Sequence, residues 1–343
     1  MNSTVSFEDG EEDKTEEFSL YVIIPLGICV AVLVVLAVMG NALTVIAFGR
    51  DIKLRSVYNM YLVNLAVTDF WLGLFSMLIY SVNTLKNYIW PFGYHFCKVF
   101  LVIDYVLCLE SVISIVIISY DRLLLLKHGP HYVLKESIKV AQVKIAISWV
   151  LAFSLYSPAI IGWDVWTGED INEPNYCGVQ FAYHFVFTTT TAVVEFVIPF
   201  IAISILNVLI YLEIRQRTVV SPMTMAGKSS SKRITDENIA GVKETTRKDI
   251  KAARFLATLV LVFALTWAPY TIATIIISFC DDCVNEYFYE FLVWLLWSKS
   301  AINPFLYAYN NTMFYKNFKE ALRCCRKSKI GNQNSTVVFH VTS

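Results

Sequence analysis

Apolar residues gather into seven long stretches that are separated by mostly short polar segments. A transmembrane β-strand would show about ten residues of alternating polarity, whereas residues 26–40 are apolar at nearly every position. A membrane-crossing helix needs roughly 20 such residues, and lipid favours helices because they satisfy their own backbone hydrogen bonds. The sequence therefore predicts an all-α membrane protein with seven transmembrane helices, over residues 20–49, 57–84, 94–126, 140–161, 182–214, 250–279 and 286–309.

The composition supports a membrane protein. Of the 343 residues, 56% are hydrophobic and only 16% are charged, whereas soluble domains carry about 25% charged residues. The formal net charge is zero, which excludes a strongly basic nucleic-acid-binding protein. We expect membrane lipid as a partner and no nucleic acid.

The distribution of basic residues predicts the orientation. With the N-terminus outside, only Lys14, Lys86 and Lys98 face outward, Lys299 lies in the seventh span, and every other basic residue faces the cytoplasm. The first 17 residues are strongly acidic, unlike the start of a signal peptide. We expect a multi-pass plasma-membrane protein, with Asn2 as an extracellular glycosylation site.

The spans define the domain organisation. A loop at about 215–249, rich in Ser, Thr, Lys and Asp, is expected to be flexible. Beyond the seventh span, Phe314, Phe318 and Leu322 recur every four residues, which predicts a short amphipathic helix on the inner membrane surface. The predicted parts are an N-terminal tail (1–19), the seven-helix domain (20–309), the amphipathic membrane-surface helix (310–323) and a cytoplasmic tail (324–343).

Six of the eight cysteines are expected to be bonded or modified. Cys97 and Cys177 both face the outside, where disulfides persist, and we expect them to bond and hold a loop across the outer mouth. Cys280 and Cys283 form a second plausible pair. Two cysteines that follow the membrane-surface helix are palmitoylation candidates, Cys324 and Cys325.

The cysteine and histidine spacing on the inner side suits no metal site. Nothing resembles a phosphate-binding loop or a nucleophile with its base, so we expect neither a metal nor an enzyme.

Five ionisable side chains fall deep within the spans: Asp69, Asp104, Glu110, Glu195 and Lys299. Each costs about 3 kcal/mol or more in a membrane, so each is a candidate functional residue. Asp104 lies two turns inward from Cys97 and could bind a cationic ligand, although a structural salt bridge would also explain it. Glu195 lies at a similar depth on another helix, which suggests a ligand with two polar ends. Alternatively, a protonated Glu195 bonds to a neighbour within residues 188–191.

Aromatic residues occur at the same depth as the two carboxylates. Each could add about 0.5–2 kcal/mol of cation–π attraction to a cation held at Asp104. These residues are Tyr105, Phe196, Trp267, Tyr270, Tyr289, Trp294 and Trp297.

An ordered set of motifs resembles the rhodopsin-class G-protein-coupled receptors over the whole chain. In chain order the motifs are Gly40-Asn41, Asn64 to Asp69, Trp90 to Gly93, Cys97, Asp121-Arg122, Trp149, Pro199, Trp267 to Tyr270 and Asn303 to Tyr307. Within that class, the aminergic receptors hold the ligand ammonium at the position of Asp104. The histamine receptors of the third and fourth subtypes are the most similar group, on Asp104-Tyr105, Cys108, Ile118 to Arg122, Glu195 to Pro199, Trp267 to Thr271 and Trp294 to Trp297.

The resemblance implies a histamine-like amine between Asp104 and Glu195. The ligand-binding residues it implies are Asp104, Tyr105, Cys108, Thr191, Glu195, Trp267, Tyr270, Thr271, Tyr289, Trp294 and Trp297. Catecholamine receptors usually place serines near Glu195, and muscarinic receptors have Asn at the position of Thr271, so both groups fit less well.

The resemblance also implies signalling by an outward movement of the sixth helix, which Pro269 would kink. At the inner end, Arg122 would pair with Asp121 and Asp249. The implied partners are a heterotrimeric G protein, of the inhibitory class, and arrestin and receptor kinases. The switch residues are Asp121, Arg122, Pro199, Asp249, Phe263, Pro269, Asn303, Pro304 and Tyr307.

Lys299 departs from the family pattern, which usually has Asn at this position. It would fall in the family's sodium site, whose other residues correspond to Asp69, Ser111, Ser300 and Asn303. The hypothesis is that Lys299 pairs with Asp69 or Glu110 and replaces control by sodium. No cofactor is therefore expected.

Three alternatives remain open. Opsins attach retinal to a Lys seven residues before the Pro of the Asn-Pro motif, where this chain has Trp297. A transporter or channel could use the five buried charges as an ion path. A receptor of the same fold could bind another amine (acetylcholine-like or a monoamine) or an orphan or peptide ligand.

Overall fold

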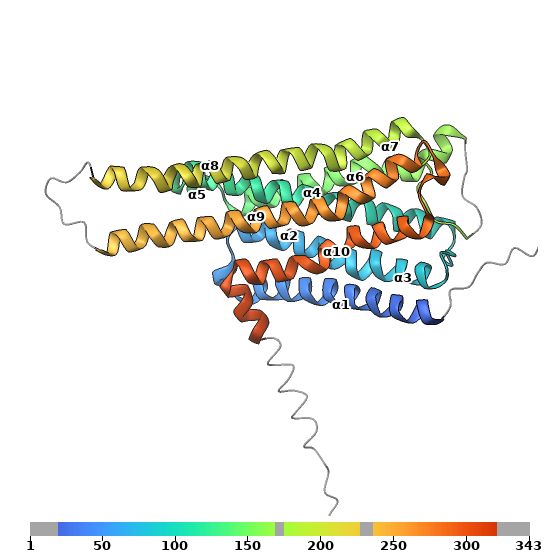
Figure 1. Ribbon diagram of the computed structural model, residues 1–343, viewed down its shortest axis with the longest axis horizontal. Helices are drawn as coiled ribbons and strands as arrows, with labels where there is room; N and C mark the ends of the chain where they lie inside the picture. The colour runs from blue at the N-terminus through green and yellow to red at the C-terminus, as the bar shows by residue number, and fades with distance from the viewer. Residues whose placement is uncertain (1–19, 169–174, 227–235, 321–343) are drawn as a thin grey trace, which may run out of the picture.

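The computed structural model describes residues 20–168, 175–226 and 236–320 (Figure 1). Within these ranges the chain forms helices and loops and no β-strand. In chain order the elements are α1 (Leu20–Arg50), η1 (Ile52–Leu54), α2 (Val57–Trp71), η2 (Leu72–Met77), α3 (Leu78–Leu85), α4 (Tyr94–His128), α5 (Pro130–Lys135), α6 (Ile138–Thr167), α7 (Phe185–Ala192), η3 (Val193–Val197), α8 (Ile198–Ala226), α9 (Asp236–Ile277), η4 (Asp281–Cys283) and α10 (Glu286–Asn310).

These elements form the seven-helix bundle that the sequence predicts. Six membrane-spanning helices are long and apolar enough by themselves in the described ranges. The seventh, α10, is less apolar because it carries Lys299, Asn303 and Pro304. Two spans are interrupted by π-helical turns, since η2 separates α2 from α3 and η3 separates α7 from α8.

The connection between the fifth and sixth spans differs from the prediction. A loop over 215–249 was expected, but α8 continues to Ala226 and α9 begins at Asp236. The two helices project past the rest of the bundle (Figure 1). The predicted bounds of this loop are therefore wrong, and residues 227–235 lie outside the described part of the chain.

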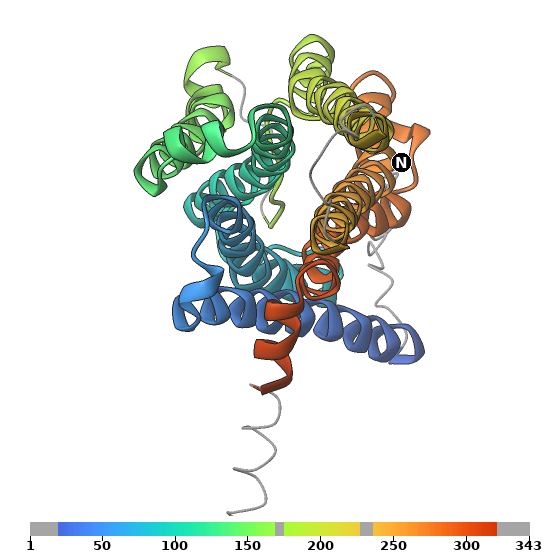
Figure 2. The same cartoon turned by 90° about the vertical axis from the view of Figure 1, so that its left-hand side faces the viewer.

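The third span, α4, forms the centre of the bundle. In the most apolar 18-residue segment of α4, 67% of the residues are buried, against 11% in the corresponding segment of α1. The α4 helix packs against α2, α6 and α8. An end-on view shows the helices around a common interior (Figure 2). Exposed leucine, isoleucine and valine side chains on α1 and α8 then face the lipid.

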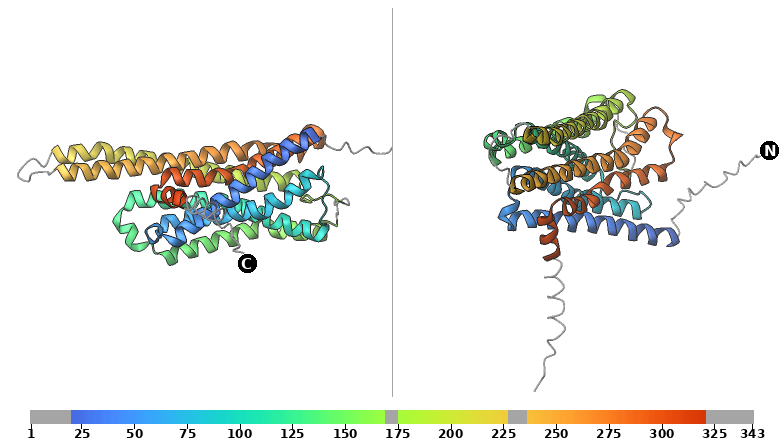
Figure 3. Two further views of the ribbon diagram at one scale, coloured as in Figure 1. Left: turned by 90° about the horizontal axis from the view of Figure 1, so that it is seen from below. Right: turned by 60° about the vertical axis from the view of Figure 1, so that its left-hand side comes forward.

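The α1 helix lies at the periphery of the bundle, crosses it obliquely and contacts α2 and α10 (Figure 3, left). Glycine permits this approach: a Cβ added at Gly40 would lie 2.7 Å from the ring of Pro304. Beyond α10, residues 312–320 form the short helix expected there, which turns away from the bundle axis (Figure 3, right). Its Phe314 side chain is completely buried, and the ring of Phe318 lies 6.4 Å from it.

Candidate functional site

Asp104 on α4 carries a buried carboxylate oxygen without a partner. Asp104 Oδ1 makes no hydrogen bond of normal geometry in the described part of the chain. The Ser76 hydroxyl and the Trp297 indole nitrogen are also buried and lie close enough to interact with this carboxylate, but neither makes a hydrogen bond of normal geometry. Because burying an unpaired polar group costs free energy, this cluster would gain stability from a polar or cationic ligand.

Glu195 lies in η3, the π-helical turn of the fifth span. Such a turn inserts one extra residue and is frequent at functional sites. The Glu195 carboxylate accepts a hydrogen bond from the Tyr156 hydroxyl of α6. The Tyr156 ring packs 4.9 Å from that of Tyr105, which follows Asp104 in sequence. The helix that carries Asp104 therefore packs, through Tyr105, against the tyrosine that bonds to Glu195.

Aromatic rings from three spans pack against one another near Asp104. Tyr270 of α9 and Tyr289 of α10 have ring centroids 5.6 Å apart. Trp294 and Trp297 of α10 are 5.4 Å apart, and Tyr80 of α3 lies 5.2 Å from Trp297. These rings bring four of the predicted ligand residues onto one side of the bundle.

A second series of rings runs from Glu195 towards the bundle interior. Phe196, the next residue in η3, lies 5.5 Å from Phe263 of α9, and Phe263 lies 5.5 Å from Trp267. Trp267 is almost fully buried, and its indole nitrogen has no partner in the described ranges. A change at Glu195 can therefore reach α9 by direct packing.

Three smaller residues of the predicted ligand set are two threonines, whose hydroxyls bond within their own helices, and a cysteine. The Thr191 hydroxyl donates to the Phe187 carbonyl oxygen at 3.1 Å, and the Thr271 hydroxyl donates to the Trp267 carbonyl oxygen at 3.0 Å. With these bonds made, both hydroxyls can only accept from a ligand. Cys108 is a buried free thiol.

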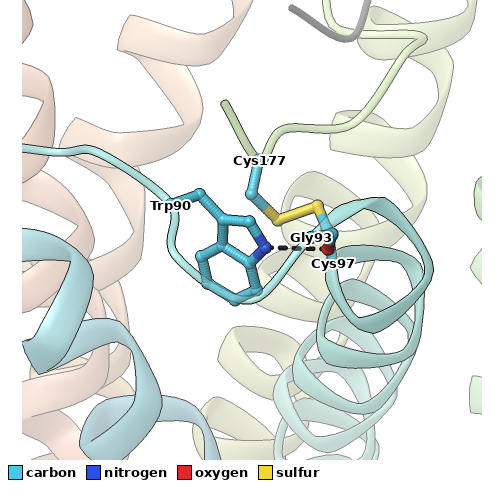
Figure 4. Close-up of a disulfide and its surroundings, with 4 residues drawn as sticks. All are labelled: Trp90, Gly93, Cys97 and Cys177. Carbon is cyan, nitrogen blue, oxygen red and sulfur yellow. Dashed lines mark hydrogen bonds between the residues drawn. A yellow bond between two sulfur atoms is a disulfide. The ribbon is translucent and has the colours of Figure 1, made fainter. Parts of the chain in front are cut away.

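Two disulfides lie at the end of the bundle where α4 begins. Cys97, at the start of α4, is bonded to Cys177, and Cys280 is bonded to Cys283. Beside the first, the Trp90 indole nitrogen donates to the Gly93 carbonyl oxygen at 3.0 Å (Figure 4). The loop that carries Cys177 is thereby tied to the end of the helix that carries Asp104.

The opposite end of the bundle, where α4 terminates, contains one of the two predicted arginine pairs. Arg122 Nη2 of α4 lies 3.3 Å from Asp249 Oδ1 of α9. The expected pair of Arg122 with Asp121 does not form; Asp121 instead accepts a hydrogen bond from the Tyr132 hydroxyl of α5 at 2.7 Å. Burial, together with this hydrogen bond, raises the pKa of Tyr132, so the phenol keeps the proton that it donates.

The predicted switch prolines lie within or beside helices. Pro269 lies inside α9 and Pro304 inside α10, and each removes one backbone hydrogen bond. Pro199 is the second residue of α8, which begins where η3 ends. Tyr307 is completely buried, and its hydroxyl has no partner among the described residues.

Comparison with known proteins identifies the family. The sequence model of the protein family "7 transmembrane receptor (rhodopsin family)" matches residues 40–307. The chain belongs to the rhodopsin family of seven-transmembrane receptors. It is therefore a membrane receptor of the G-protein-coupled type and not an enzyme.

Individual relatives of the receptor are similar over nearly their whole lengths. The histamine H4 receptor of Rattus norvegicus is 28% identical over 393 residues, covering 95% of this chain and 99% of that receptor. The human histamine H4 receptor is 27% identical over 394 residues, at 96% and 99% coverage. The human muscarinic acetylcholine receptor M1 is 25% identical over 409 residues, at 87% and 89% coverage.

The residues at the family's sodium-site positions bond to one another in the receptor. Asp69 accepts hydrogen bonds from the Ser300 hydroxyl and the Asn303 amide, each at 2.6 Å. Lys299 Nζ donates to the Ser111 hydroxyl at 3.0 Å. No carboxylate of the described residues lies within ion-pairing distance of Nζ. The expected pair of Lys299 with Asp69 is therefore not formed.

Glu110 does not pair with Lys299 either. Its Oε1 accepts hydrogen bonds from Asn64 Nδ2 of α2 at 2.7 Å, from Ser148 of α6 at 2.8 Å and from Ser114 at 3.3 Å. The Trp149 indole nitrogen donates to the Asn64 side-chain oxygen at 3.1 Å. Glu110 thus joins α2, α4 and α6, and the predicted Lys299–Glu110 pair is wrong.

Sequence reasoning missed several residues of the site. Tyr156, the donor to Glu195, carried no signal, because tyrosines at this depth usually only pack. Tyr80 was also missed; its hydroxyl donates to both Glu290 oxygens, at 2.7 and 2.8 Å. Three predicted modification sites lie outside the described residues: Asn2, Cys324 and Cys325.

Proposed function

We propose that this receptor binds a small cationic amine, most similar to histamine, between Asp104 and Glu195. The observation that carries the proposal is Asp104 Oδ1, a buried carboxylate oxygen without a partner in the described part of the chain. A ligand ammonium would supply the missing donor and the compensating charge. The surrounding rings would each add about 0.5–2 kcal/mol of cation–π attraction.

Glu195 gives the proposal its second contact. A carboxylate accepts more than two hydrogen bonds, so Glu195 can accept from an imidazole N–H while Tyr156 still donates to it. A ligand with an ammonium at one end and an N–H donor at the other matches these two acceptors. The similarity to histamine H4 receptors supports the same ligand class.

The packing supports a route for signalling. A ligand at Glu195 would press on Phe196 and, through Phe263, on Trp267 of α9. Movement of α9 would break the ion pair that Asp249 makes with Arg122 and open the inner end to a heterotrimeric G protein, of the inhibitory class. Arrestin and receptor kinases would use the same face.

The proposal includes the topology that this signalling requires. The N-terminal tail would lie outside at the plasma membrane and carry a glycan on Asn2. The third cytoplasmic loop, the membrane-surface helix and the tail would lie inside, with palmitate on Cys324 and Cys325. Basic residues of the inner loops would also attract anionic lipid.

The test is a panel of amines applied to the full-length receptor in cells, with G-protein activation as the readout. Asp104→Asn should remove the response to every amine, because the ligand charge loses its counter-ion; loss of one partner of a buried pair costs about 3–5 kcal/mol. Glu195→Gln should weaken histamine much more than a simple alkyl amine. Equal losses for both ligands would refute the role of Glu195.

A second candidate ligand is an acetylcholine-like amine, favoured by the similarity to the muscarinic receptor. A quaternary ammonium has no N–H to donate to Glu195, so Glu195→Gln should leave its potency nearly unchanged. The same panel therefore separates the two candidates. If the unmodified receptor responds to neither ligand, its ligand would be another monoamine or a peptide.

A further inference from the structure

Lys299 is a buried lysine between three helices. Its side chain is 2% exposed and extends from the middle of α10. Nζ donates to the Ser111 hydroxyl of α4 at 3.0 Å and lies 4.8 Å from the ring centroid of Trp267 in α9. The carboxylates of Asp69 and Asp104 are near enough to act on its charge electrostatically.

The residues around Lys299 do not suit a bound sodium ion. A sodium ion would need oxygen ligands. The candidates beside Lys299 are the Asp69 carboxylate and the Ser111 hydroxyl. The Asp69 oxygens accept one hydrogen bond each, from Ser300 and Asn303, and so keep free lone pairs. What excludes the ion is Lys299, whose Nζ already contacts the Ser111 oxygen. In addition, the Lys299 ammonium repels a second cation strongly in this low-dielectric interior.

We propose that Lys299 is a tethered cation that takes the place of a diffusible sodium ion in this receptor. It supplies positive charge beside Asp69 without a direct ion pair, and its Nζ contacts both the Trp267 ring and the Ser111 hydroxyl. Sodium then neither stabilises the receptor nor changes its agonist affinity. This inference does not depend on which ligand the receptor binds.

The contact with Trp267 gives the lysine a regulatory position. A cation over an indole ring is attracted by about 2 kcal/mol where it is desolvated, so a ligand that moves Trp267 must also change the environment of Nζ. The flexible lysine stem and its three N–H donors allow Nζ to exchange acceptors as this happens. A sodium ion would be free to leave, whereas Lys299 is retained in every state.

The central experiment uses no ligand, so its outcome is independent of the amine proposal. The full-length receptor is purified, and its melting temperature is measured in sodium chloride and in N-methylglucamine chloride of equal ionic strength. A bound ion stabilises the folded state by mass action. We expect equal melting temperatures for the wild type, and higher temperatures in sodium for both Lys299→Asn and Lys299→Met.

Two results would overturn the proposal. One is a wild-type melting temperature that rises in sodium, with the rise abolished by Asp69→Asn. The other is a wild type and two Lys299 variants that are all insensitive to sodium, because Lys299 would then not be what excludes the ion. The wild-type measurement retains its meaning even if one variant fails to fold.

A second readout follows agonist binding once an agonist is in hand. Replacing sodium should leave the agonist affinity of the wild type within twofold. In Lys299→Asn, sodium should change that affinity by about fivefold or more, the lower end of typical coupling between sites. A fivefold sodium effect in the wild type would contradict the proposal.

Discussion

The Tyr156 hydroxyl of α6 donates a hydrogen bond to the Glu195 carboxylate in the π-helical turn of the fifth span. This bond fixes the direction in which Glu195 can meet a ligand. In Tyr156→Phe the carboxylate loses a donor and is no longer held in place. Because hydrogen bonds to charged groups contribute about 1.5–3 kcal/mol, the affinity for histamine should fall by about tenfold or more.

The measurement is competition binding with histamine and with a simple alkyl amine. The alkyl amine makes no contact with Glu195 in the proposed site, so its affinity should hardly change. Tyr211→Phe is a matched control, since Tyr211 lies on the exposed surface of α8 at 62% exposure. If Tyr156→Phe weakened both amines equally, Tyr156 would support the fold and not the position of Glu195.

The ion pair between Arg122 and Asp249 should hold the inner ends of α4 and α9 together. Asp249→Asn removes the negative charge and keeps the side-chain shape, so we expect a higher rate of G-protein activation without ligand. Basal nucleotide exchange, normalised to surface expression, measures the effect. Asp249→Glu keeps the charge and should remain near the wild-type rate. An unchanged basal rate in Asp249→Asn would remove this pair from the switch.

The sequence was sufficient to predict the helical bundle because each span is a long apolar run. The carboxylates stood out for the same reason: Asp104 and Glu195 interrupt such runs, and a buried charge in a membrane needs an explanation. Membership of the rhodopsin family then agreed with the ordered motifs. The spacing of apolar residues along the chain predicts that a helix exists and which residues share one of its faces.

The partners of the buried polar groups were not predictable in the same way. Lys299 bonds to Ser111 and not to Asp69, and Asp121 bonds to Tyr132 and not to Arg122. These choices depend on the rotation of each helix and on shifts of about an ångström between neighbours, which spacing within one helix does not encode. The π-helical turn at Glu195 also had no sequence signal, since it differs from an α-helix by a single inserted residue.

The two disulfides should contribute unequally to stability. Cys97 and Cys177 are 80 residues apart in sequence, and Cys280 and Cys283 are 3 apart. In the chain-entropy model the longer loop gives about 4.5 kcal/mol and the shorter about 2 kcal/mol. Cys97→Ser with Cys177→Ser should therefore lower the melting temperature of the purified receptor more than Cys280→Ser with Cys283→Ser. Equal losses would show that loop closure is not what these bonds contribute.

Glu110 should be a structural centre of the bundle. It is completely buried, and one of its oxygens accepts hydrogen bonds from Asn64, Ser114 and Ser148. Glu110→Ala leaves these donors without their acceptor and opens a cavity, which together should cost about 3 kcal/mol or more. Glu110→Gln keeps one acceptor oxygen and nearly the same volume, so it should cost much less.

The comparison is the temperature at which half of the detergent-solubilised receptor is inactivated. Ser154→Ala is a suitable control, because the Ser154 hydroxyl bonds only to the Val150 carbonyl oxygen of its own helix at an exposed site. We expect Glu110→Ala to lie far below the wild type, and Glu110→Gln and the control to lie near it. If Glu110→Gln were as unstable as Glu110→Ala, the negative charge of Glu110, and not its hydrogen bonds across α2, α4 and α6, would be what the fold requires.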